Sequence, residues 1–330
     1  MRFTLSFLFV FFAWGAFSQN KVLFEIGRQD GSASEFALYP NRYDAFLAQF
    51  GGEKSYYVGY SVPEKHWSYV LPGPLDQWAG GGYWAGFHPR HFPSIWFQVK
   101  NAAKQGNCTL SLIFAGVNDT HSVKIRIEIN GHRLEKEIKG EDNSALLKSE
   151  TTSGKPQTVT VNFPCSWLKK GINRIQLGSI AGSWAIFDCI RLETPEKMLL
   201  GEASSSLIHS VKAAPFEYLL GDGSRVQPVL VEMTQLDEAR ELTFQVNGFP
   251  DITRRIEAGE SIQEIYIPAF PAGRRPEKAV FTIQQGNEIV YRGDIVRSPA
   301  PLHEYADDVD LMMGTGNSRW MFKPGPCLPL

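Results

Sequence analysis

The most constraining feature of this chain is a series of short runs in which apolar and polar residues alternate. Two such runs, residues 123–129 and 133–138, flank the dipeptide Asn130-Gly131. Alternation with a period of two places the apolar side chains on one face of a strand, and Asn-Gly favours the tight turn of a hairpin. The sequence therefore predicts an antiparallel sheet rather than a helical protein.

Further runs of this kind recur along the chain with Gly, Pro and Asn between them. In the first part we expect strands at residues 21–27, 94–99, 109–114 and 158–163, with short helical segments at residues 43–49 and 166–170. Regular short strands with little helical periodicity are typical of sandwiches. We therefore predict an all-β fold that begins with a jelly-roll, galactose-binding-like β-sandwich over residues 21–197.

Residues 171–193, GINRIQLGSIAGSWAIFDCIRLE, hold the last two apolar runs of this first module. The runs cover residues 172–177 and 184–192, and small residues separate them. Ile190 and Leu192 share one side of a strand, whereas Arg191 and Glu193 share the other. This pattern predicts an antiparallel hairpin that closes the sandwich.

A second module follows a stretch that loses periodicity, residues 196–206, which contains Gly201 and a run of three serines. New strand-like runs then occur at residues 207–212, 227–233, 241–246, 263–267, 279–283 and 288–296. About seven short strands in a segment of this size favour an immunoglobulin-like or fibronectin-like β-sandwich. We predict this sandwich over residues 204–298, in the role of a spacer.

The first residues have the pattern of an export signal. Arg2 precedes an apolar run rich in Phe at residues 5–16, and Ala16-Phe17-Ser18 fits a small-x-small cleavage site. The run is too short for a membrane span, and no later stretch is long and apolar enough for one. The sequence predicts a signal peptide at residues 1–18 and a secreted or periplasmic protein.

The charges are nearly balanced, since 33 Lys and Arg face 35 Asp and Glu, for a formal net charge of −2. A chain that binds nucleic acid or an anionic membrane surface is usually strongly basic, so we expect neither partner. The chain has four cysteines, at positions 108, 165, 189 and 327. Export permits disulfides, and Cys165 with Cys189 is one candidate pair, although free thiols are equally compatible with the sequence.

Three stretches of the first module resemble a known family. Residues 24–36 (FEIGRQDGSASEF), 56–74 (YYVGYSVPEKHWSYVLPGP) and 173–193 (NRIQLGS…SWAIFDCIRLE) are similar, in order and spacing, to the C-terminal domain of rhamnogalacturonan lyases of polysaccharide lyase family 4. The resemblance implies a carbohydrate-binding-module-like jelly roll and a polysaccharide or glycan partner. The family's catalytic Lys and His belong to another domain, to which nothing in this chain is similar.

Aromatic residues gather in the loop-rich half of this module. A pyranose ring needs an apolar face to stack on and polar groups that fix its hydroxyls. The candidates for carbohydrate binding are Trp67, Trp78, Tyr83, Trp84 and Arg90. The alternative is that these aromatic side chains fill the core beneath long loops.

A calcium site is a second possibility. Asp188 lies in the last strand of the module, while Asp30 and Glu35 follow the first strand. First and last strands of such folds commonly lie side by side, so these three carboxylates could supply the hard oxygen ligands that calcium prefers. Alternatively, Asp188 accepts hydrogen bonds from backbone amides at a bend of the strand.

The last part, residues 299–330, is expected to be an extended tail. Its final 23 or so residues, VD–x3–GTGNSRWMF–x–PGP–x2–P, resemble the opening of the catalytic region of glycoside hydrolase family 92. That resemblance implies a calcium-dependent, inverting, secreted or periplasmic exo-α-mannosidase as the parent. An inverting glycosidase needs two separated carboxylates, and the region that supplies them would follow Leu330. We therefore expect a truncated chain that lacks its C-terminal catalytic domain.

These observations predict an exported, non-catalytic accessory region of a polysaccharide-degrading enzyme, in which the jelly roll binds carbohydrate. One alternative is that only the full-length parent has rhamnogalacturonan lyase or α-mannosidase activity. Another is that the first module itself is a lyase, for which the only nearby group of bases and cations is His66, His88, Arg90 and His91. A third is a structural brace for the missing catalytic domain.

Overall fold

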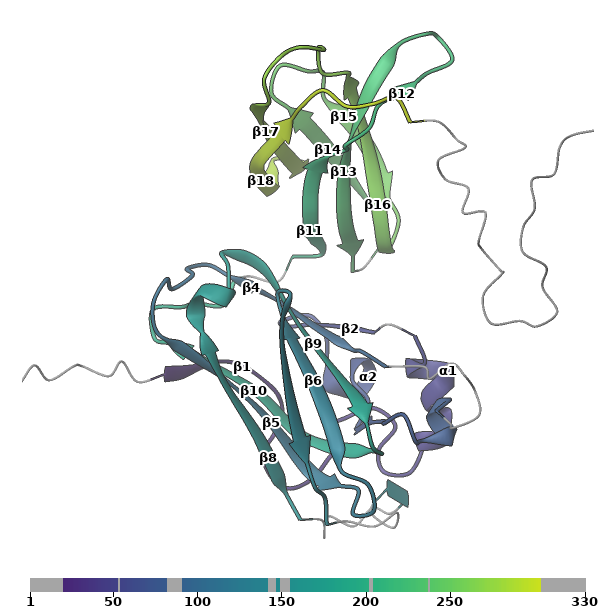
Figure 1. Ribbon diagram of the computed structural model, residues 1–330, viewed down its shortest axis with the longest axis vertical. Helices are drawn as coiled ribbons and strands as arrows, with labels where there is room; N and C mark the ends of the chain where they lie inside the picture. The colour runs from purple at the N-terminus through teal and green to yellow at the C-terminus, as the bar shows by residue number, and fades with distance from the viewer. Residues whose placement is uncertain are drawn as a thin grey trace, which may run out of the picture. The chain divides into compact units, whose positions relative to one another are not determined.

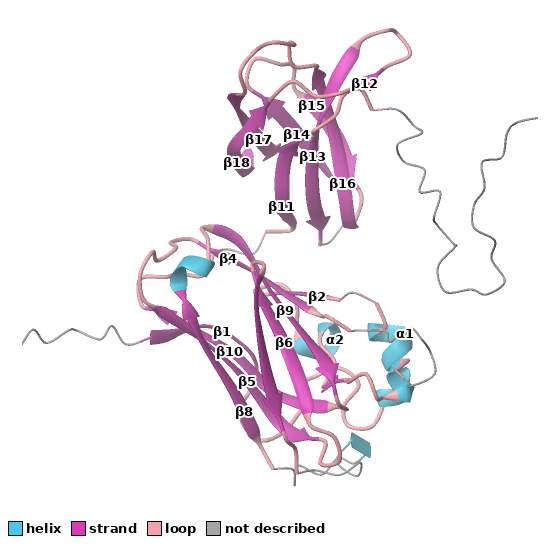
Figure 2. Cartoon of the chain, viewed as in Figure 1, coloured by secondary structure: helices cyan, strands magenta, loops and turns pink. Residues whose placement is uncertain are grey.

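The computed structural model describes residues 20–52, 54–81, 91–141, 147–148, 155–201, 204–236 and 238–303. The chain divides into two compact units, Met1–Ala203 and Ser204–Leu330. Strands dominate both units, and the helices are short (Figure 1, Figure 2). Within the described ranges, no helix has the length and apolar character needed to cross a bilayer.

The first unit is built from two five-stranded sheets. One sheet has the order β1 (Asn20–Gly27), β10 (Ala185–Pro195), β5 (Asn107–Val117) and β8 (Gln157–Pro164), with β3 (Val70–Leu71) also paired to β10. The other has the order β2 (Ser55–Tyr57), β4 (Ser94–Val99), β9 (Gly171–Ala181), β6 (Val123–Ile129) and β7 (His132–Ile138). Every pair is antiparallel except the parallel pair β2–β4.

The core lies between these sheets and follows from the alternation in the sequence. In β6 the side chains are alternately buried and half-buried, and Val123, Ile125 and Ile127 are completely inaccessible to solvent. The opposite sheet contributes Phe114 and Phe187, whose ring centroids lie 5.4 Å apart. Full burial of one such side chain stabilises the fold by about 1.5–3 kcal/mol, so the inward faces together dominate the stability of this unit.

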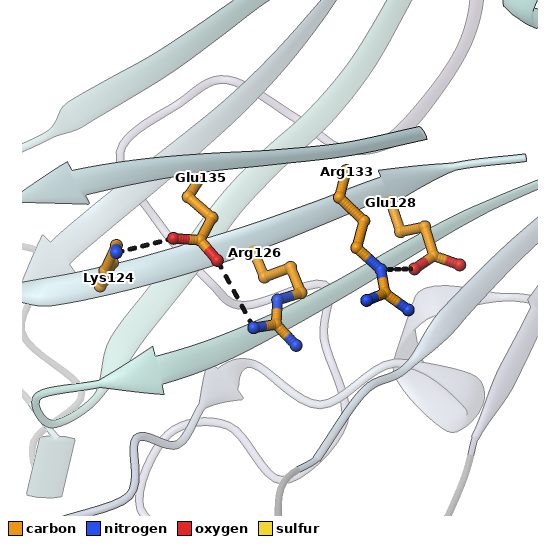
Figure 3. Close-up of polar contacts among 5 residues, drawn as sticks. All are labelled: Lys124, Arg126, Glu128, Arg133 and Glu135. Atoms are coloured by element: carbon orange, nitrogen blue, oxygen red, sulfur yellow. Dashed lines mark hydrogen bonds and ion pairs between the residues drawn. The ribbon is translucent and has the colours of Figure 1, made fainter. Parts of the chain in front are cut away.

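The outward faces of β6 and β7 carry charge instead (Figure 3). Glu135 accepts Lys124 Nζ at 2.6 Å and Arg126 Nη2 at 3.4 Å, and Arg133 Nε lies 2.7 Å from a carboxylate oxygen of Glu128. Exposed ion pairs of this kind add little to stability. Because β7 is the edge strand of its sheet, their charges hinder pairing with the strand of another chain.

The Asn-Gly turn between β6 and β7 is present as predicted. Asn130 has φ 47° and Gly131 has φ 89°, the left-handed conformations that a two-residue hairpin turn requires. Asn173 of β9, which is 1% exposed, fixes this turn: its Oδ1 accepts Asn130 Nδ2 and the Lys169 amide, both at 2.8 Å. Its Nδ2 donates to the carbonyls of Lys169 at 2.8 Å and Gly171 at 2.9 Å.

The predicted closing hairpin at residues 171–193 is wrong. Both of its strands exist, but β9 pairs with β4 and β6, whereas β10 pairs with β1, β3 and β5, in the other sheet. The chain crosses between sheets at the small residues that follow β9. There Gly182 has φ 86°, and a Cβ atom on it would lie 1.9 Å from the Ser122 carbonyl oxygen. Each apolar run therefore supplies one wall of the core.

The first and last strands of the unit are neighbours, as expected: β1 pairs with β10, with Ile26 opposite Ile190. The long connection between β1 and β4 contains several short helical segments, whereas the sequence predicted one there, at residues 43–49. These are η1 (Tyr43–Ala45), α1 (Phe46–Phe50), α2 (Pro63–His66) and η2 (Gln77–Ala79), and η3 (Cys165–Trp167) follows β8. Helices α1 and α2 lie on the side of the sandwich next to β2 (Figure 1).

The second unit has two four-stranded antiparallel sheets. One consists of β11 (Ser206–Ala213), β13 (Arg225–Gln235), β12 (Tyr218–Leu219) and β16 (Gly259–Pro268), and the other has the order β15 (Ile252–Ile256), β14 (Arg240–Val246), β17 (Glu277–Gln285) and β18 (Glu288–Arg297). Val229, Val231 and Met233 of β13 are buried in one core with Phe244 and Phe281. The predicted fold class is confirmed: the chain is all-β, with a jelly-roll β-sandwich followed by an immunoglobulin-like or fibronectin-like β-sandwich.

Asn173 gives the first testable expectation. Asn173→Ala removes both hydrogen-bonding groups of this buried side chain, and with them four part-buried hydrogen bonds to Asn130, Lys169 and Gly171. We therefore expect the free energy of unfolding to fall by about 2–4 kcal/mol. Urea denaturation measures this loss. The matched control is Asn162→Ala, because the exposed Asn162 accepts a single hydrogen bond, from Thr109 Oγ1 at 2.9 Å. Equal losses for the two variants would contradict a special role for Asn173.

Candidate functional site

The loop-rich connection between β1 and β4 is tied to the sheets by backbone hydrogen bonds. Tyr69 N–H donates to the Ala37 carbonyl at 3.0 Å, and Phe187 N–H of β10 donates to the Tyr69 carbonyl at 2.8 Å. The phenol of Tyr69, itself fully buried, donates to the Leu147 carbonyl at 2.9 Å. This part of the connection is therefore hydrogen-bonded to the neighbouring backbone much as a strand is.

Trp67 belongs to the core. Its side chain is 2% exposed, and its ring lies edge-on to Tyr56 and Phe187, with centroids 6.1 Å and 5.7 Å away. The alternative that the sequence left open, an aromatic side chain that fills the core beneath a loop, describes this residue. The buried indole Nε1 has no hydrogen-bond partner.

Trp78 is the second aromatic candidate and is half-buried. It lies in η2, edge-on to Tyr43 at 5.3 Å and to Phe46 at 5.8 Å. Part of its ring is therefore available to a ligand. The remaining candidates, Tyr83, Trp84 and Arg90, lie outside the described residues.

A pocket opens beside these aromatic residues. Its lining is mostly apolar and includes Phe46 and Phe50 of α1, with Lys54, His66 and His91 as its basic side chains. The empty space measures about 340 Å³ including the part open to solvent, and a water-sized sphere can move through only about 20 Å³ of it, so the pocket is shallow and narrow. Apolar walls with a few convergent polar groups are the usual composition of a small-ligand site.

The two histidines of the pocket differ in what they can offer a ligand. His91 is 7% exposed, and its Nε2 donates to the Ala79 carbonyl at 2.8 Å while its ring lies edge-on to Phe46 at 4.9 Å. His66 is half-buried, and its Nδ1 lies 3.0 Å from both the amide nitrogen and the carbonyl oxygen of Val62. Its Nε2 can therefore donate to a ligand hydroxyl when Nδ1 accepts the amide, or accept from one when Nδ1 donates to the carbonyl. His88 and Arg90 lie outside the described residues.

Sequence reasoning missed most of this pocket. Phe46 and Phe50 are four residues apart, so one short helix presents both rings on the same side, and this spacing could have identified them. Lys54 is an isolated exposed lysine in the sequence, and no local pattern marks it. It joins the pocket because its carbonyl accepts the Ser94 amide at 2.8 Å, which places it at the start of β4.

Asp76 is another residue that the sequence did not reveal. The carboxylate is 5% exposed; its Oδ2 accepts the Gly73 amide at 2.7 Å, and its Oδ1 accepts the Ser183 hydroxyl at 2.5 Å. Burial raises the pKa of Asp76 to about 6, although these two hydrogen bonds and the nearby His121 lower it. Asp76 thus fastens the loop after β3 to the crossover between β9 and β10.

Asp188 has the capping role that the sequence offered as an alternative. Its side chain is 1% exposed, and its Oδ1 accepts the backbone amides of Asp30 at 3.1 Å and Gly31 at 3.2 Å. Burial raises the pKa of Asp188, and the amide hydrogen bonds oppose that rise. Asp188 therefore contacts the residues that follow β1, but its carboxylate accepts hydrogen bonds from their backbone N–H groups rather than sharing an ion with their side chains.

The three carboxylates proposed for calcium do not form a cluster. Over the ranges that the structure describes, no group of three or more His, Cys, Asp or Glu side chains is placed to hold a metal ion. Asp30 Oδ1 accepts the Ser32 amide at 3.0 Å. Glu35 Oε2 faces Ser34 Oγ at 3.4 Å, whereas Glu35 Oε1 is buried without a hydrogen-bond partner. Among these three carboxylates, Glu35 Oε1 is the oxygen to which a bound cation would supply the missing partner.

Asp76 makes the stability of the chain depend on pH. Its folded-state pKa of about 6 lies above the ordinary value of 3.8, so the folded state binds this proton more tightly. The resulting stabilisation is complete below about pH 4 and is lost as the pH rises through about 6, with a magnitude of about 3 kcal/mol. We expect Asp76→Asn, which can still accept from Gly73 and donate to Ser183, to flatten this dependence.

Urea denaturation of the wild type and of Asp76→Asn at pH 4, 5, 6 and 7 measures the effect. Asp119→Asn is the control, because Asp119 is an exposed carboxylate of the same unit whose Oδ1 accepts the Thr120 hydroxyl at 3.0 Å, and the variant should keep the wild-type slope. The role assigned to Asp76 is refuted if Asp76→Asn keeps the full wild-type slope between pH 4 and 6.

Several solved structures show weak likeness to the chain. A family 35 carbohydrate-binding module from an environmental isolate is 24% identical, with a TM-score of 0.24, over 34% of this chain and 72% of that one. A GH2 β-galacturonidase from Eisenbergiella tayi is 12% identical (TM-score 0.20; 61% and 34%), and dimeric latent PorU from Porphyromonas gingivalis is 10% identical (TM-score 0.24; 64% and 18%). These TM-scores are too low to carry an argument about function.

No curated protein sequence matches the chain. A family model does: residues 22–192 match the model described as CBM-like, polysaccharide lyase family 4, domain III. The matched residues run from β1 into β10 and so span both sheets of the first unit. The chain belongs to the family of CBM-like domains that form domain III of polysaccharide lyase family 4.

Proposed function

We propose that the first unit is a carbohydrate-binding accessory domain of an exported polysaccharide-degrading protein, with the second unit as its spacer. The observation that carries the proposal is the match of residues 22–192 to a family of carbohydrate-binding-module-like domains. The fold is in keeping with this role, because a rigid two-sheet core presents its connecting loops without needing to move.

The pocket beside α1 is the proposed contact point for the glycan. Phe46 and Phe50 supply apolar surface, half-buried Trp78 packs against Phe46, and Lys54 and His66 can donate to hydroxyl or carboxylate oxygens. A hydrogen bond of this kind contributes about 0.5–1.5 kcal/mol, or about 1.5–3 kcal/mol when one partner is charged. Lys54 is exposed and His66 is half-buried, so both are accessible to a polymer that approaches from solvent.

The same pocket gives little support to lyase chemistry. β-Elimination needs a base that takes a proton next to a carboxylate and a group that neutralises the carboxylate. His91 is buried and its Nε2 already donates to a backbone carbonyl. His66 and Lys54 remain, but Nδ1 of His66 is engaged with the backbone of Val62. Contact with a glycan suits these groups better than proton abstraction.

Export and a glycosidase parent are part of the proposal on sequence grounds. Residues 1–18 have the pattern of a signal peptide, and the last 23 or so residues resemble the opening of a family 92 glycoside hydrolase region. Both segments lie outside the described residues. In this proposal the two sandwiches connect a glycan surface to an α-mannosidase-type catalytic domain.

Retention of the purified 330-residue chain on polysaccharide gels tests glycan binding. We expect slower migration in gels that contain rhamnogalacturonan or mannan, and a loss of affinity of about tenfold, equivalent to about 1.4 kcal/mol, for Lys54→Ala or His66→Ala. Lys136→Ala is the matched control, because Lys136 is an exposed lysine of β7 in the same unit. Trp67→Ala is unsuitable, since it would open a cavity in the core.

The possible outcomes separate the alternatives. Equal losses for Lys54→Ala and Lys136→Ala would indicate attraction of a polyanion by charge alone. No retention of the wild type on any polysaccharide would favour the structural brace. Release of an unsaturated, ultraviolet-absorbing product from rhamnogalacturonan would overturn the non-catalytic reading.

Calcium binding at Asp30, Glu35 and Asp188 stays a prediction, which the buried Oε1 of Glu35 supports and the amide-capped Asp188 does not. If an ion binds, calcium at about a hundred times its Kd should raise the Tm of the full chain by about 5 °C or more, and EDTA should reverse the shift. Glu35→Gln should abolish the shift, whereas Glu64→Gln in the exposed start of α2 should not. An unchanged Tm in saturating calcium rules out a structural ion.

A further inference from the structure

Two cysteine side chains meet at one end of the first sheet. Cys108 is the second residue of β5, and the antiparallel pairing of β5 with β8 places it opposite Phe163. Cys165 follows two residues later, where β8 gives way to η3. The Cys165 amide donates to the Gly106 carbonyl at 3.0 Å, which holds the end of β8 against the start of β5.

The two sulfur atoms lie 2.8 Å apart, and both side chains are completely inaccessible to solvent. A disulfide bond length is about 2.05 Å, so the sulfurs need to move by less than an ångström to become bonded. No other part of the backbone has to rearrange, because the strand pairing already brings the two residues together. We infer that Cys108 and Cys165 form a disulfide that joins β5 to the end of β8.

Cys189 is not the partner, although the sequence left the pair Cys165–Cys189 open. It lies in β10, on the other side of β5, where it faces Ile113. Five residues separate Ile113 from Cys108 along β5, which corresponds to about 17 Å. A disulfide requires Cα atoms within about 7 Å of each other, so Cys189 is out of reach of both Cys108 and Cys165.

The bond forms by exchange with an external disulfide, such as oxidised glutathione or a protein oxidant of the same class. The Cys108 thiolate attacks one sulfur of that disulfide and releases the other half as a thiol. The Cys165 thiolate then attacks the mixed disulfide at Cys108 and releases the second half. In the balance, two cysteine thiols are oxidised, one external disulfide is reduced to two thiols, and the cysteine protons end on those thiols.

Burial determines when this exchange can occur. It raises the pKa of the Cys108 thiol and that of the Cys165 thiol, and the thiolate is the attacking species. Folded chains should therefore oxidise slowly, whereas chains that fold in the presence of the oxidant should close the bond before the core excludes it. The disulfide would close a loop that contains most of β5 and all of β6, β7 and β8. Cross-links across long loops stabilise most.

The experiment refolds the full 330-residue chain with either oxidised glutathione or a reductant. Free thiols are then blocked, and non-reduced peptides are identified by mass spectrometry. After oxidative refolding we expect one peptide pair that joins Cys108 to Cys165, and a Tm about 5–10 °C above that of the reduced chain. A chain folded under reducing conditions and treated with the oxidant afterwards should keep both thiols for hours.

Variants supply the control. Cys108→Ala and Cys165→Ala should each abolish the dependence of Tm on the refolding oxidant, whereas Cys189→Ala should keep it. The peptide map of the wild type shows directly whether Cys108 and Cys165 are cross-linked, so the test holds even if a substitution prevents folding. Free thiols at positions 108 and 165 after oxidative refolding, or a cross-link from either to Cys189 or Cys327, would overturn the inference. Neither result bears on glycan binding.

Discussion

The first unit depends on one constraint: two sheets must bury the inward faces of their strands against each other. The constraint is visible in β6, where every second side chain is inaccessible to solvent. It also explains why Asp76 and Asp188 are buried, since both fasten loops to the ends of the sheets with carboxylate oxygens that accept backbone amides. Burying a carboxylate is costly unless hydrogen bonds compensate. The contacts of these two aspartates are therefore explained by the stability of the fold, without a functional site.

Much of the fold could be predicted from the sequence because a strand with one buried face shows a local alternation of apolar and polar residues. The runs at residues 94–99 and 123–129 coincide with β4 and β6, and Asn130-Gly131 specified its turn through backbone conformation. The sheet partners of residues 172–177 and 184–192, which do not pair with each other, could not be predicted in the same way. Which sheet a strand joins depends on partners more than forty residues away, and the apolar pattern of β10 is the same for either sheet.

The candidate site was less predictable for a related reason. An aromatic residue in a loop-rich stretch can fill the core or face solvent, and local sequence does not distinguish Trp67, which is buried, from Trp78, which is half-buried. Lys54 and His66 come together from separate segments, so their proximity exists only in the folded chain. Cys108 and Cys165 show the same limitation, because residues 57 positions apart meet through strand register alone.

The position of β10 also determines when the domain can fold during synthesis. β10 lies between β1 and β5, and β1 pairs with it at the edge of the sheet. Until residues 185–195 have been made, the earliest strand has no neighbour and its hydrogen-bonding groups face solvent. Such distant pairing slows folding and exposes strand edges in the meantime. The first unit is therefore complete only when its last strand arrives, so assembly of this sheet must be a late and cooperative event.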